Sequence, residues 1–493
     1  MDKKLTFVVG IDLGTQGVRC LICDLKGKIY VEARNDITSS KKEGDRFEQD
    51  PEEWWIKTKS CLRNTVGLFI KNGYSPEDIC ALACDSTSGT ILSIGENGQV
   101  ISPALMYNDS RAKEEAAIIN ASAQDFYNKM GYQFDPSFAL CKVLWIKRHD
   151  PELYQKTRFF VHACDFLMGQ FTGKVAQSDI SNSLKMGFDL LEMKWPDFIE
   201  TALDLDTRKL PSVYKTGEVV GMVLPSIAGE FGFFPSLPIV AGATDGTAAF
   251  FASGARIPGD VSCTLGTTLV VRSISEKLVK DPQGRIYCHR HPEGYWLPGG
   301  ASNTGGECLK KFFPDGHYET WDQEVMKINL PTSLLVYPLT RTGERLPFAS
   351  SVAEFFQIGK ERNRTELYAA CLEGVGYIER YSYSLLEKLG STPIRRVFSS
   401  GSGARSGIWR QIRTNILGKP VHLPATTESA MGACIIAATP LLGSLSRAGA
   451  EMVTISDVIE PENKLIALYD EKYHLFVEEC QKRGLIPRSE HEI

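Results

Sequence analysis

Two short turns of small and polar residues stand at corresponding places in the two halves of this 493-residue chain, Asp12–Gly17 and Leu265–Thr268. Glycines in such turns let backbone N–H groups approach phosphate oxygens closely, and threonine and glutamine side chains add further donors. Asp12 also offers a carboxylate that can hold the water shell of Mg²⁺. The two turns therefore predict a pair of phosphate-binding loops. Their predicted binding residues are Gly14, Thr15, Gln16, Gly266, Thr267 and Thr268.

A further acidic segment, Ala241-Gly-Ala-Thr-Asp-Gly-Thr247, follows the apolar run Leu237–Val240. Asp245 lies where a strand is expected to give way to a helix, and the simplest interpretation of this residue is a helix cap. The functional interpretation is a general base. Phosphoryl transfer to a hydroxyl group needs such a carboxylate, because the attacking hydroxyl must lose its proton.

A third glycine-rich turn, Gly401-Ser-Gly-Ala-Arg-Ser-Gly407, follows the apolar run that contains Phe398. Its G-x-G-x-x-x-G spacing is one residue too long for a dinucleotide-binding fingerprint, and no ribose-binding acid follows at the expected place. The phosphate-binding pattern G-x-x-x-x-G-K-[ST] is absent from the sequence. These observations disfavour a Rossmann oxidoreductase and a P-loop enzyme, and favour a turn against which an adenosine could lie flat.

The elements that must position these turns are those of an α/β chain. Phe7–Ile11 and Val18–Cys23 are apolar runs typical of strands, and a long helix is expected after Asp50, which can cap it. Val8–Arg19 resembles Val261–Arg272, about half a chain away, and each has a strand on either side of a Leu-Gly-Thr turn. We interpret this repeat as a duplication. A duplicated pair of domains would enclose a cleft, which is a common type of ligand site.

The composition is typical of a chain with more than one hydrophobic core, since 43% of the residues are hydrophobic and 23% are charged. The formal net charge of −5 argues against a broad nucleic-acid-binding surface. The sequence shows neither a long apolar stretch for a membrane span nor a secretory signal, so we expect a cytoplasmic protein. The 13 cysteines are interpreted as reduced thiols, with Cys20 and Cys23 in a strand rather than at a zinc ion.

Taken in order, these turns and several further segments resemble the FGGY family of carbohydrate kinases over nearly the full chain. The further segments are Glu48–Trp55, Tyr107–Arg111, Lys142–Ile146, Asp179–Ser183, Gly343–Pro347 and Leu372–Gly374. The resemblance implies the duplicated, ribonuclease H-like α/β fold of actin-like ATPases and sugar kinases, with two domains around a cleft. It implies an N-terminal domain at residues 1–255 and a C-terminal domain at residues 256–493.

The resemblance also implies a role for each motif. Asp245 matches the catalytic base, and Asp12 matches the acid that helps to hold Mg²⁺, through water. The two Leu-Gly-Thr turns match the loops that bind the phosphates of ATP. The adenosine-binding segment matches at Gly401, Gly403 and Ala404. A serine between these two glycines departs from the Gly-Gly-Gly-Ala that is usual in the family.

The segment after Cys84 bears on the choice of substrate. Glycerol kinases carry an Arg-Glu pair there and typical xylulokinases carry Gly-Gln-Met-His, whereas this chain has Asp85-Ser-Thr-Ser-Gly89. The chain is more similar to plant and cyanobacterial pentulose kinases that prefer D-ribulose, with which it shares stretches at Ser181–Asp189 and Gly299–Gly306. The simpler interpretation of the segment is an Asx or Ser turn between two strands. The sugar-binding residues implied by the resemblance are Asp85, Ser86, Ser88, Asp109 and Asp245.

The resulting hypothesis is a kinase that uses ATP and Mg²⁺ to convert D-ribulose into D-ribulose 5-phosphate. D-xylulose is the first alternative substrate, followed by another pentulose or a polyol such as ribitol. The alternative from another class is an actin-like nucleotide switch without sugar chemistry, and the Gly-Ala-Thr-Asp-Gly context of Asp245 argues against it. An interaction scaffold is disfavoured by the two intact turns. We expect a monomer or a homodimer whose partners are a small sugar and ATP, with no nucleic acid and no membrane.

Overall fold

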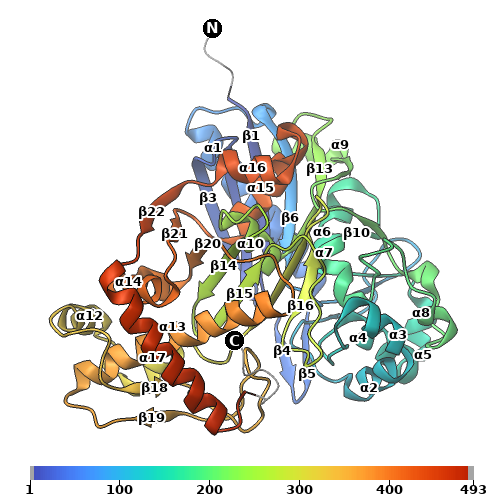
Figure 1. Cartoon of the computed structure of the whole chain (residues 1–493). Helices are drawn as coiled ribbons and strands as arrows, with labels where there is room; N and C mark the ends of the chain where they lie inside the picture. Colours follow the sequence, from blue (N-terminus) through green and yellow to red (C-terminus); the bar gives the residue numbers. More distant parts are fainter. Residues whose placement is uncertain (1–4, 487–493) are drawn as a thin grey trace. The chain divides into compact units, whose positions relative to one another are not determined.

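The computed structural model describes residues 5–486 (Figure 1). The chain divides into two units that are each discontinuous in sequence. The first contains the described residues up to Ala252 together with His289–Gly294 and Thr426–Thr454. The second contains Ser253–Cys288, Tyr295–Ala425 and the described residues from Ile455 onward. The boundary between residues 255 and 256 that the sequence suggests for the two family domains stays a prediction.

A six-stranded sheet forms the centre of the first unit. Its order is β12 (Val219–Met222), β13 (Pro238–Thr244), β6 (Ile79–Ser86), β1 (Phe7–Leu13), β2 (Gly17–Asp24) and β3 (Ile29–Asp36). The strands β13, β6 and β1 are mutually parallel, and β2 and β3 follow in antiparallel order. The three parallel strands are buried along almost their whole length, as expected for strands that are covered on both faces.

Helices cover this sheet, and one of them begins directly at the end of a central strand. The long helix α1 (Pro51–Lys71) packs on β2 and β3 and begins as predicted, because the Asp50 side chain accepts a hydrogen bond from the backbone N–H of Glu52. Helix α6 (Ala163–Thr172) packs on β6 and β13. Helix α10 (Asp245–Ala252) starts at Asp245, which confirms the predicted change from strand to helix.

Helix α15 (Ser429–Leu442) lies against β1, β6 and α10 (Figure 1). Two glycines make this close approach possible. A Cβ atom on Gly10 of β1 would lie 2.2 Å from the carbonyl oxygen of Ala430, and one on Gly432 would lie 1.9 Å from the carbonyl oxygen of Ala248. The backbones of α15, β1 and α10 therefore touch directly, and this contact helps to fix where α10 begins.

The remaining helices of the first unit complete its surface. They are α2 (Lys113–Ser122), α3 (Gln124–Met130), α4 (Ala139–His149), α5 (Pro151–Lys156), α7 (Ile180–Ser183), α8 (Phe198–Thr201), α9 (Pro225–Phe231) and α16 (Leu445–Met452). Its shorter strands are β4 (Lys41–Glu43), β5 (Arg46–Gln49), β7 (Leu92–Ile94), β8 (Ala104–Leu105), β9 (Phe159–Val161), β10 (Gln177–Asp179) and β11 (Ser212–Tyr214).

The second unit is built on a seven-stranded sheet that repeats the central arrangement of the first. Its order is β16 (Tyr287–Arg290), β17 (Trp296–Ala301), β15 (Leu269–Ser273), β14 (Asp260–Leu265), β20 (Arg396–Ser400), β21 (Val421–Pro424) and β22 (Ile455–Ile459). The hairpin β14–β15 lies beside the parallel strand β20, just as the hairpin β1–β2 lies beside β6. The two Leu-Gly-Thr turns thus occupy equivalent places in equivalent hairpins.

Helices and one further strand pair accompany this second sheet. They are α11 (Glu307–Phe312), α12 (Tyr318–Val325), α13 (Arg364–Lys388), α14 (Gly407–Leu417), α17 (Asn463–Lys482), β18 (Leu335–Tyr337) and β19 (Phe356–Ile358). A fully buried ion pair joins α14 to α13, where the guanidinium of Arg413 donates to both oxygens of Glu379 at 2.6 and 2.8 Å.

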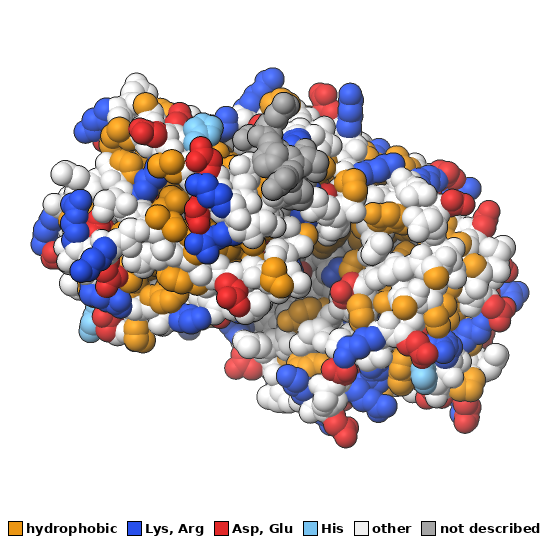
Figure 2. Space-filling model, turned by 60° about the horizontal axis from the view of Figure 1, so that its bottom comes forward, with side chains coloured by type: hydrophobic (Ala, Val, Ile, Leu, Met, Phe, Trp, Pro, Cys, Tyr) orange, Lys and Arg blue, Asp and Glu red, His pale blue; other side chains and the backbone are white. Residues whose placement is uncertain are grey.

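The surface and the helix lengths bear on the sequence predictions. Figure 2 shows acidic and basic side chains interspersed over the face in view. Within the described residues, no single helix is long and apolar enough to cross a membrane. The bent pair α15 and α16 satisfies that test by length and composition alone, and α15 is buried along most of its length.

Replacing Gly432 with alanine is expected to lower the free energy of unfolding by about 2 kcal/mol, because the added methyl group would overlap the backbone of Ala248. The control is Gly67→Ala in α1, where a Cβ atom meets nothing within 4 Å. It should raise the free energy of unfolding by about 0.5–1 kcal/mol, since alanine is the better helix former. Urea unfolding measures both. Similar effects of the two substitutions would contradict the direct contact between α15 and α10.

Candidate active site

Three aspartates meet at the carboxyl ends of the parallel strands of the first unit. Asp12 of β1 and Asp85 of β6 are directly paired in register, and Asp85 is also paired with Ala243 of β13. Asp245 directly follows the last residue of β13, Thr244. Ligands of open α/β sheets bind outside the carboxyl ends of the strands. The sheet therefore brings together three of the predicted site residues that are far apart in sequence.

Burial and mutual repulsion shape the protonation of this cluster. Asp85 is fully buried, and neither of its oxygens receives a hydrogen bond from an N–H or O–H group of residues 5–486. Burial raises its pKa well above the usual range, and the neighbouring carboxyls of Asp12 and Asp245 raise it further. Burial also raises the pKa of Asp12, against the opposing effects of the Asp85 carboxyl, Arg19 and Arg34. The two oxygens of Asp85 receive no hydrogen bond within the described residues, and Asp12 lies beside them. This pair of carboxyl groups could therefore bind a cation or the hydroxyl groups of a ligand.

The first predicted phosphate turn joins β1 to β2. The backbone N–H of Gly14 donates to the carbonyl of Gly17 at 2.9 Å, which closes the turn. The side-chain amide of Gln49 donates to the carbonyl of Thr15 at 2.8 Å, and the N–H of Ile37 donates to the carbonyl of Gln16 at 3.0 Å. The carbonyls of Thr15 and Gln16 are thus held by residues outside the turn, and the Gln16 side chain is exposed to solvent.

Asp245 is held at a rigid junction. It is half-buried, and one of its carboxylate oxygens accepts a hydrogen bond of 2.6 Å from the N–H of Gly246. The preceding residue, Thr244, exchanges hydrogen bonds with the hydroxyl of Ser181, at 3.0 Å between the hydroxyls and 3.2 Å from the backbone N–H. Thr247 closes this network with hydrogen bonds to both hydroxyls. The carboxylate therefore projects from a strand and a helix whose backbones are fixed.

The segment Asp85–Gly89, which we call the acceptor loop, continues from β6. The hydroxyl of Ser86 accepts a hydrogen bond of 2.9 Å from the backbone N–H of Cys164, so it is engaged inside the protein. The hydroxyl of Ser88, in contrast, is buried and has no hydrogen-bond partner within the described chain. Gly89 has a φ of +83°, a conformation that strongly favours glycine. Ser88 thus has a free hydroxyl for a ligand, and Ser86 has a structural contact.

A buried lysine fixes the far end of the acceptor loop. The amine of Lys142, in α4, donates to the carbonyls of Gly89 at 2.9 Å and of Met106 at 2.6 Å. Burial lowers the pKa of Lys142 to about 7. Nearby, a ring nitrogen of His162 lies 3.0 Å from the carbonyl of Thr90, and burial lowers the pKa of this histidine to about 4. Sequence analysis recognised Lys142 only as part of a family segment, since its contact with Gly89 joins positions 53 residues apart.

Asp109 forms its hydrogen bonds with residues other than the three aspartates of the acidic cluster. Its two oxygens accept hydrogen bonds from the guanidinium of Arg111 at 2.9 and 2.7 Å, and one of them also accepts from the N–H of Phe47 at 2.7 Å. Arg111 in turn reaches Glu48 at 2.6 Å and lies over the ring of Trp145. The carboxylate is fully buried within this network. A direct contact of Asp109 with the sugar stays a prediction.

In the second unit the Gly266–Thr268 turn is held by a glycine pair. The N–H of Gly306 donates to the carbonyl of Gly266 at 2.9 Å, and the N–H of Glu307 donates to that of Thr267 at 3.0 Å. A Cβ atom on Gly305 would lie 2.6 Å from the backbone of Thr268. The glycine-rich segment Gly299–Gly306 therefore packs its backbone directly on the predicted phosphate turn.

Glu344 positions this packing, and sequence analysis did not single it out. Its carboxylate accepts hydrogen bonds from the hydroxyls of Ser302 at 2.9 Å and Thr304 at 2.8 Å, and from Tyr337 at 3.0 Å. It also accepts from the N–H of Asn303. The Gly-Glu-Arg segment was a signal for the family, but the partner side chains lie elsewhere in the sequence.

The predicted adenosine segment follows β20. Gly401 has a φ of +88°, and a Cβ atom there would lie 2.4 Å from the carbonyl oxygen of Leu265. Gly403 and Ala404 are buried beside it in a short 3₁₀ turn. Because β14 and β20 are parallel neighbours, their carboxyl ends bring Gly266 and Gly401 to the same edge of the sheet. The glycine at 401 is required by the backbone conformation and by this close contact.

Comparison with known proteins places the chain in a family. Residues 7–252 match the N-terminal domain, and residues 261–440 the C-terminal domain, of the FGGY family of carbohydrate kinases. The chain is 28% identical over 419 residues to a xylulose kinase of Escherichia coli, covering 83% of this chain and 85% of that one. It is 25% identical to a gluconokinase of Bacillus subtilis, covering 87% of each.

A solved structure described as a xyloylose kinase from Brucella ovis superposes with a TM-score of 0.88 at 23% identity, covering 97% of this chain and 99% of that one. This likeness confirms the predicted duplicated fold of actin-like ATPases and sugar kinases. The chain belongs to the FGGY family of carbohydrate kinases and is a phosphotransferase that acts on a sugar, in a family that uses ATP. The sugar kinase is thereby favoured over the nucleotide switch.

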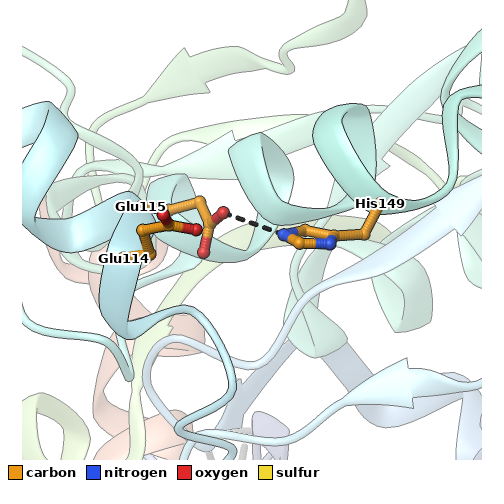
Figure 3. A group of neighbouring side chains, drawn as sticks. All are labelled: Glu114, Glu115 and His149. Atoms are coloured by element: carbon orange, nitrogen blue, oxygen red, sulfur yellow. Dashed lines mark hydrogen bonds and ion pairs between the residues drawn. The ribbon is translucent and has the colours of Figure 1, made fainter.

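A second group of ionisable side chains lies outside this site. Within residues 5–486, one group of carboxylate and imidazole side chains lies close enough together to share a metal ion. It consists of Glu114, Glu115 and His149. Figure 3 shows Glu115 linked to His149, at 3.2 Å. Arg148 pairs with both glutamates and offsets one of their two negative charges. We interpret the group as a contact that joins α2 to α4.

Asp85→Asn is expected to make the protein more stable at pH 7. An aspartate whose pKa is raised on folding binds protons more tightly in the folded chain, so its contribution to stability falls as the pH rises above its unfolded pKa of 3.8. Asparagine does not ionise. The stability of the variant relative to the natural protein should therefore grow between pH 5 and pH 8, by at most about 1.4 kcal/mol per pH unit.

Urea unfolding at several pH values measures this difference. The control is Asp109→Asn, which removes a buried carboxylate that is already paired with Arg111. It should lower the free energy of unfolding by more than about 1 kcal/mol across the same range. An Asp85→Asn protein that is less stable than the natural one at every pH would contradict the unsatisfied state of Asp85.

Proposed function

We propose that this protein transfers the γ-phosphoryl group of ATP to D-ribulose, giving D-ribulose 5-phosphate, with Asp245 as the general base. The observation that carries the proposal is the cluster of Asp12, Asp85 and Asp245 at the carboxyl ends of three parallel strands. The two buried oxygens of Asp85, which receive no hydrogen bond from an N–H or O–H group within the described residues, suit a ligand that brings several hydroxyl groups or a cation. The acceptor loop beside it differs from the Gly-Gln-Met-His that is typical of xylulokinases, which favours D-ribulose.

In this proposal the chain's own residues orient the sugar and move one proton. Asp245 accepts the proton of the terminal hydroxyl, whose oxygen forms a bond to the γ-phosphorus while ADP leaves. Asp85 and Ser88 bind other hydroxyls of the sugar. The rigid junction before α10 holds the base in one orientation, which lowers the entropy cost of reaching the transition state.

The residues proposed to bind the nucleotide are those that the family resemblance implies. The residues for its phosphates are Gly14, Thr15, Gln16, Gly266, Thr267 and Thr268, and those for its adenosine are Gly401, Gly403 and Ala404. Asp12, with Asp85 beside it, would hold Mg²⁺, since a hard divalent cation relieves the repulsion between two buried carboxylates. When bound, Mg²⁺ supplies positive charge that stabilises the phosphoryl group in transfer.

D-xylulose is the second candidate substrate, because the relatives that the chain resembles include several named xylulose kinase. A coupled assay of ADP formation with Mg²⁺ tests both against L-ribulose, ribitol, glycerol and gluconate. We expect the highest kcat/KM for D-ribulose. A higher kcat/KM for D-xylulose would overturn the choice of sugar but keep the kinase. Hydrolysis of ATP that no sugar increases would contradict the proposed function altogether.

Asp245→Asn should lower kcat by about 100-fold to 10,000-fold, because an amide cannot accept the proton of the hydroxyl. The KM for ATP should stay within about threefold, since the proposed role concerns the acceptor. Steady-state kinetics with saturating sugar measure both constants. The control is Asp197→Asn, which removes an exposed carboxylate of the first unit and should leave kcat unchanged. Near-normal turnover of the Asp245 variant would show that another group is the base.

A further inference from the structure

Lys185 is a half-buried lysine whose ammonium has no polar partner within residues 5–486. It lies in the short 3₁₀ turn Leu184–Met186 that follows α7. Its ammonium lies over the ring of Phe138, at 5.2 Å from the centroid, and makes no hydrogen bond or ion pair with the other residues that the structure describes. An ammonium has three donors and no acceptor, so a half-buried one without an oxygen partner can bind a ligand oxygen.

The side chain of Lys185 reaches the acceptor loop. A Cβ atom built on Gly89 would lie 3.1 Å from Cδ and 3.8 Å from Nζ of Lys185. Lys142 also reaches Gly89, but its amine is already used by two backbone carbonyls. Of these two lysines at the acceptor loop, Lys185 is therefore the one with hydrogen-bonding capacity to spare.

The segment that carries Lys185 begins beside the proposed base. Ser181, in α7, is hydrogen-bonded to Thr244, the residue that precedes Asp245. Four residues later the same segment brings Lys185 to Gly89. The segment Ile180–Met186 therefore borders the acidic cluster at one end and the acceptor loop at the other, so a ligand held by Asp85 and Asp245 lies within its reach.

The acidic cluster and Lys185 offer opposite kinds of hydrogen-bonding group to a ligand. The acidic cluster offers acceptor oxygens, including the oxygens of Asp85, to which no N–H or O–H group within residues 5–486 donates. Lys185 offers only donors. The matching ligand has hydroxyl donors at one end and, at the other, an oxygen that can only accept a hydrogen bond. Ketoses and sugar acids have such an oxygen, as a carbonyl or a carboxylate group. A polyol has hydroxyls alone.

We propose that Lys185 is a substrate-binding residue that donates to the carbonyl or carboxylate oxygen of the acceptor, and so makes the site prefer ketoses and sugar acids over polyols. This inference rests on the proposed function for the location of the acceptor. It assigns a specificity role to a residue of the shared stretch Ser181–Asp189 for which the sequence analysis gave no role, in the first unit and on an element that carries no phosphate loop.

The test is Lys185→Met, which keeps the length of the side chain and removes its charge. Dissociation constants for D-ribulose, D-xylulose, D-gluconate and ribitol are measured by titration calorimetry without nucleotide, and kcat and KM with ATP and Mg²⁺. A lost hydrogen bond from a charged donor should weaken binding of the preferred ketose or sugar acid at least about tenfold. Binding of ribitol should change less than threefold, and kcat should fall little. Whether the two ketoses or gluconate lose more affinity tells whether Lys185 binds a carbonyl or a carboxylate oxygen.

The matched control is Lys59→Met in α1, since Lys59 lies over the ring of Trp55 as Lys185 lies over Phe138. It should leave every constant unchanged. Lys185→Arg keeps a charged donor and should keep the preference over ribitol.

The inference is overturned if Lys185→Met weakens ribitol as much as the other ligands, if it changes none of them, or if the natural protein binds no ketose or sugar acid more tightly than ribitol. The proposed function is decided separately, by whether the natural protein phosphorylates a pentulose. A protein that phosphorylates D-ribulose with no contribution from Lys185 keeps the function and loses the inference. Lys185-dependent binding without phosphorylation keeps the inference and loses the function.

Discussion

The crowding of the buried Asp85 carboxyl against the half-buried carboxyls of Asp12 and Asp245 is the constraint on which the candidate site depends. Parallel pairing places Asp12 directly beside Asp85, and the β13–α10 junction adds Asp245. Such a cluster is unfavourable in the empty protein, because burial and like charge both oppose ionisation. Under the proposed function, this loss of stability is retained because the cluster binds a cation and hydroxyl donors. The arrangement explains why the surrounding elements are held so firmly.

The surrounding contacts fix the backbone on every side of that cluster. The close approach of α15, which Gly10 and Gly432 permit, supports β1 and α10 from one face of the sheet. The Ser181–Thr244 hydrogen bonds hold the residue before the base, and Lys142 holds the end of the acceptor loop. Among the polar groups that stay without a hydrogen bond within residues 5–486 are Asp85, Ser88 and Lys185. A hydroxylated ligand with an acceptor oxygen would satisfy these three.

In the second unit, the Leu-Gly-Thr turn is held in place by a different set of residues. Its β14–β15 hairpin has the same place beside a parallel strand as β1–β2, but the turn is supported by the backbone of Gly305 and Gly306 rather than by a glutamine amide. Glu344 gathers Ser302, Thr304 and Tyr337 around one carboxylate and so fixes the glycine pair. Duplication has preserved the strand order and the turn, while the residues that hold the turn have diverged.

The sequence by itself determined the family and the α/β class. It also determined the starts of those helices that nearby residues specify. Asp50 caps α1 and Asp245 opens α10 because side-chain and backbone chemistry within a few residues decides where a helix starts. Only the tertiary structure decided which side chains remain available to a ligand. Ser86 is hydrogen-bonded to Cys164, and Asp109 is hydrogen-bonded to Arg111. The Ser88 hydroxyl and the Lys185 ammonium, in contrast, have no hydrogen-bond partner within residues 5–486. The register of neighbouring strands and contacts between distant segments set these differences, and no pattern within a short stretch of sequence encodes them.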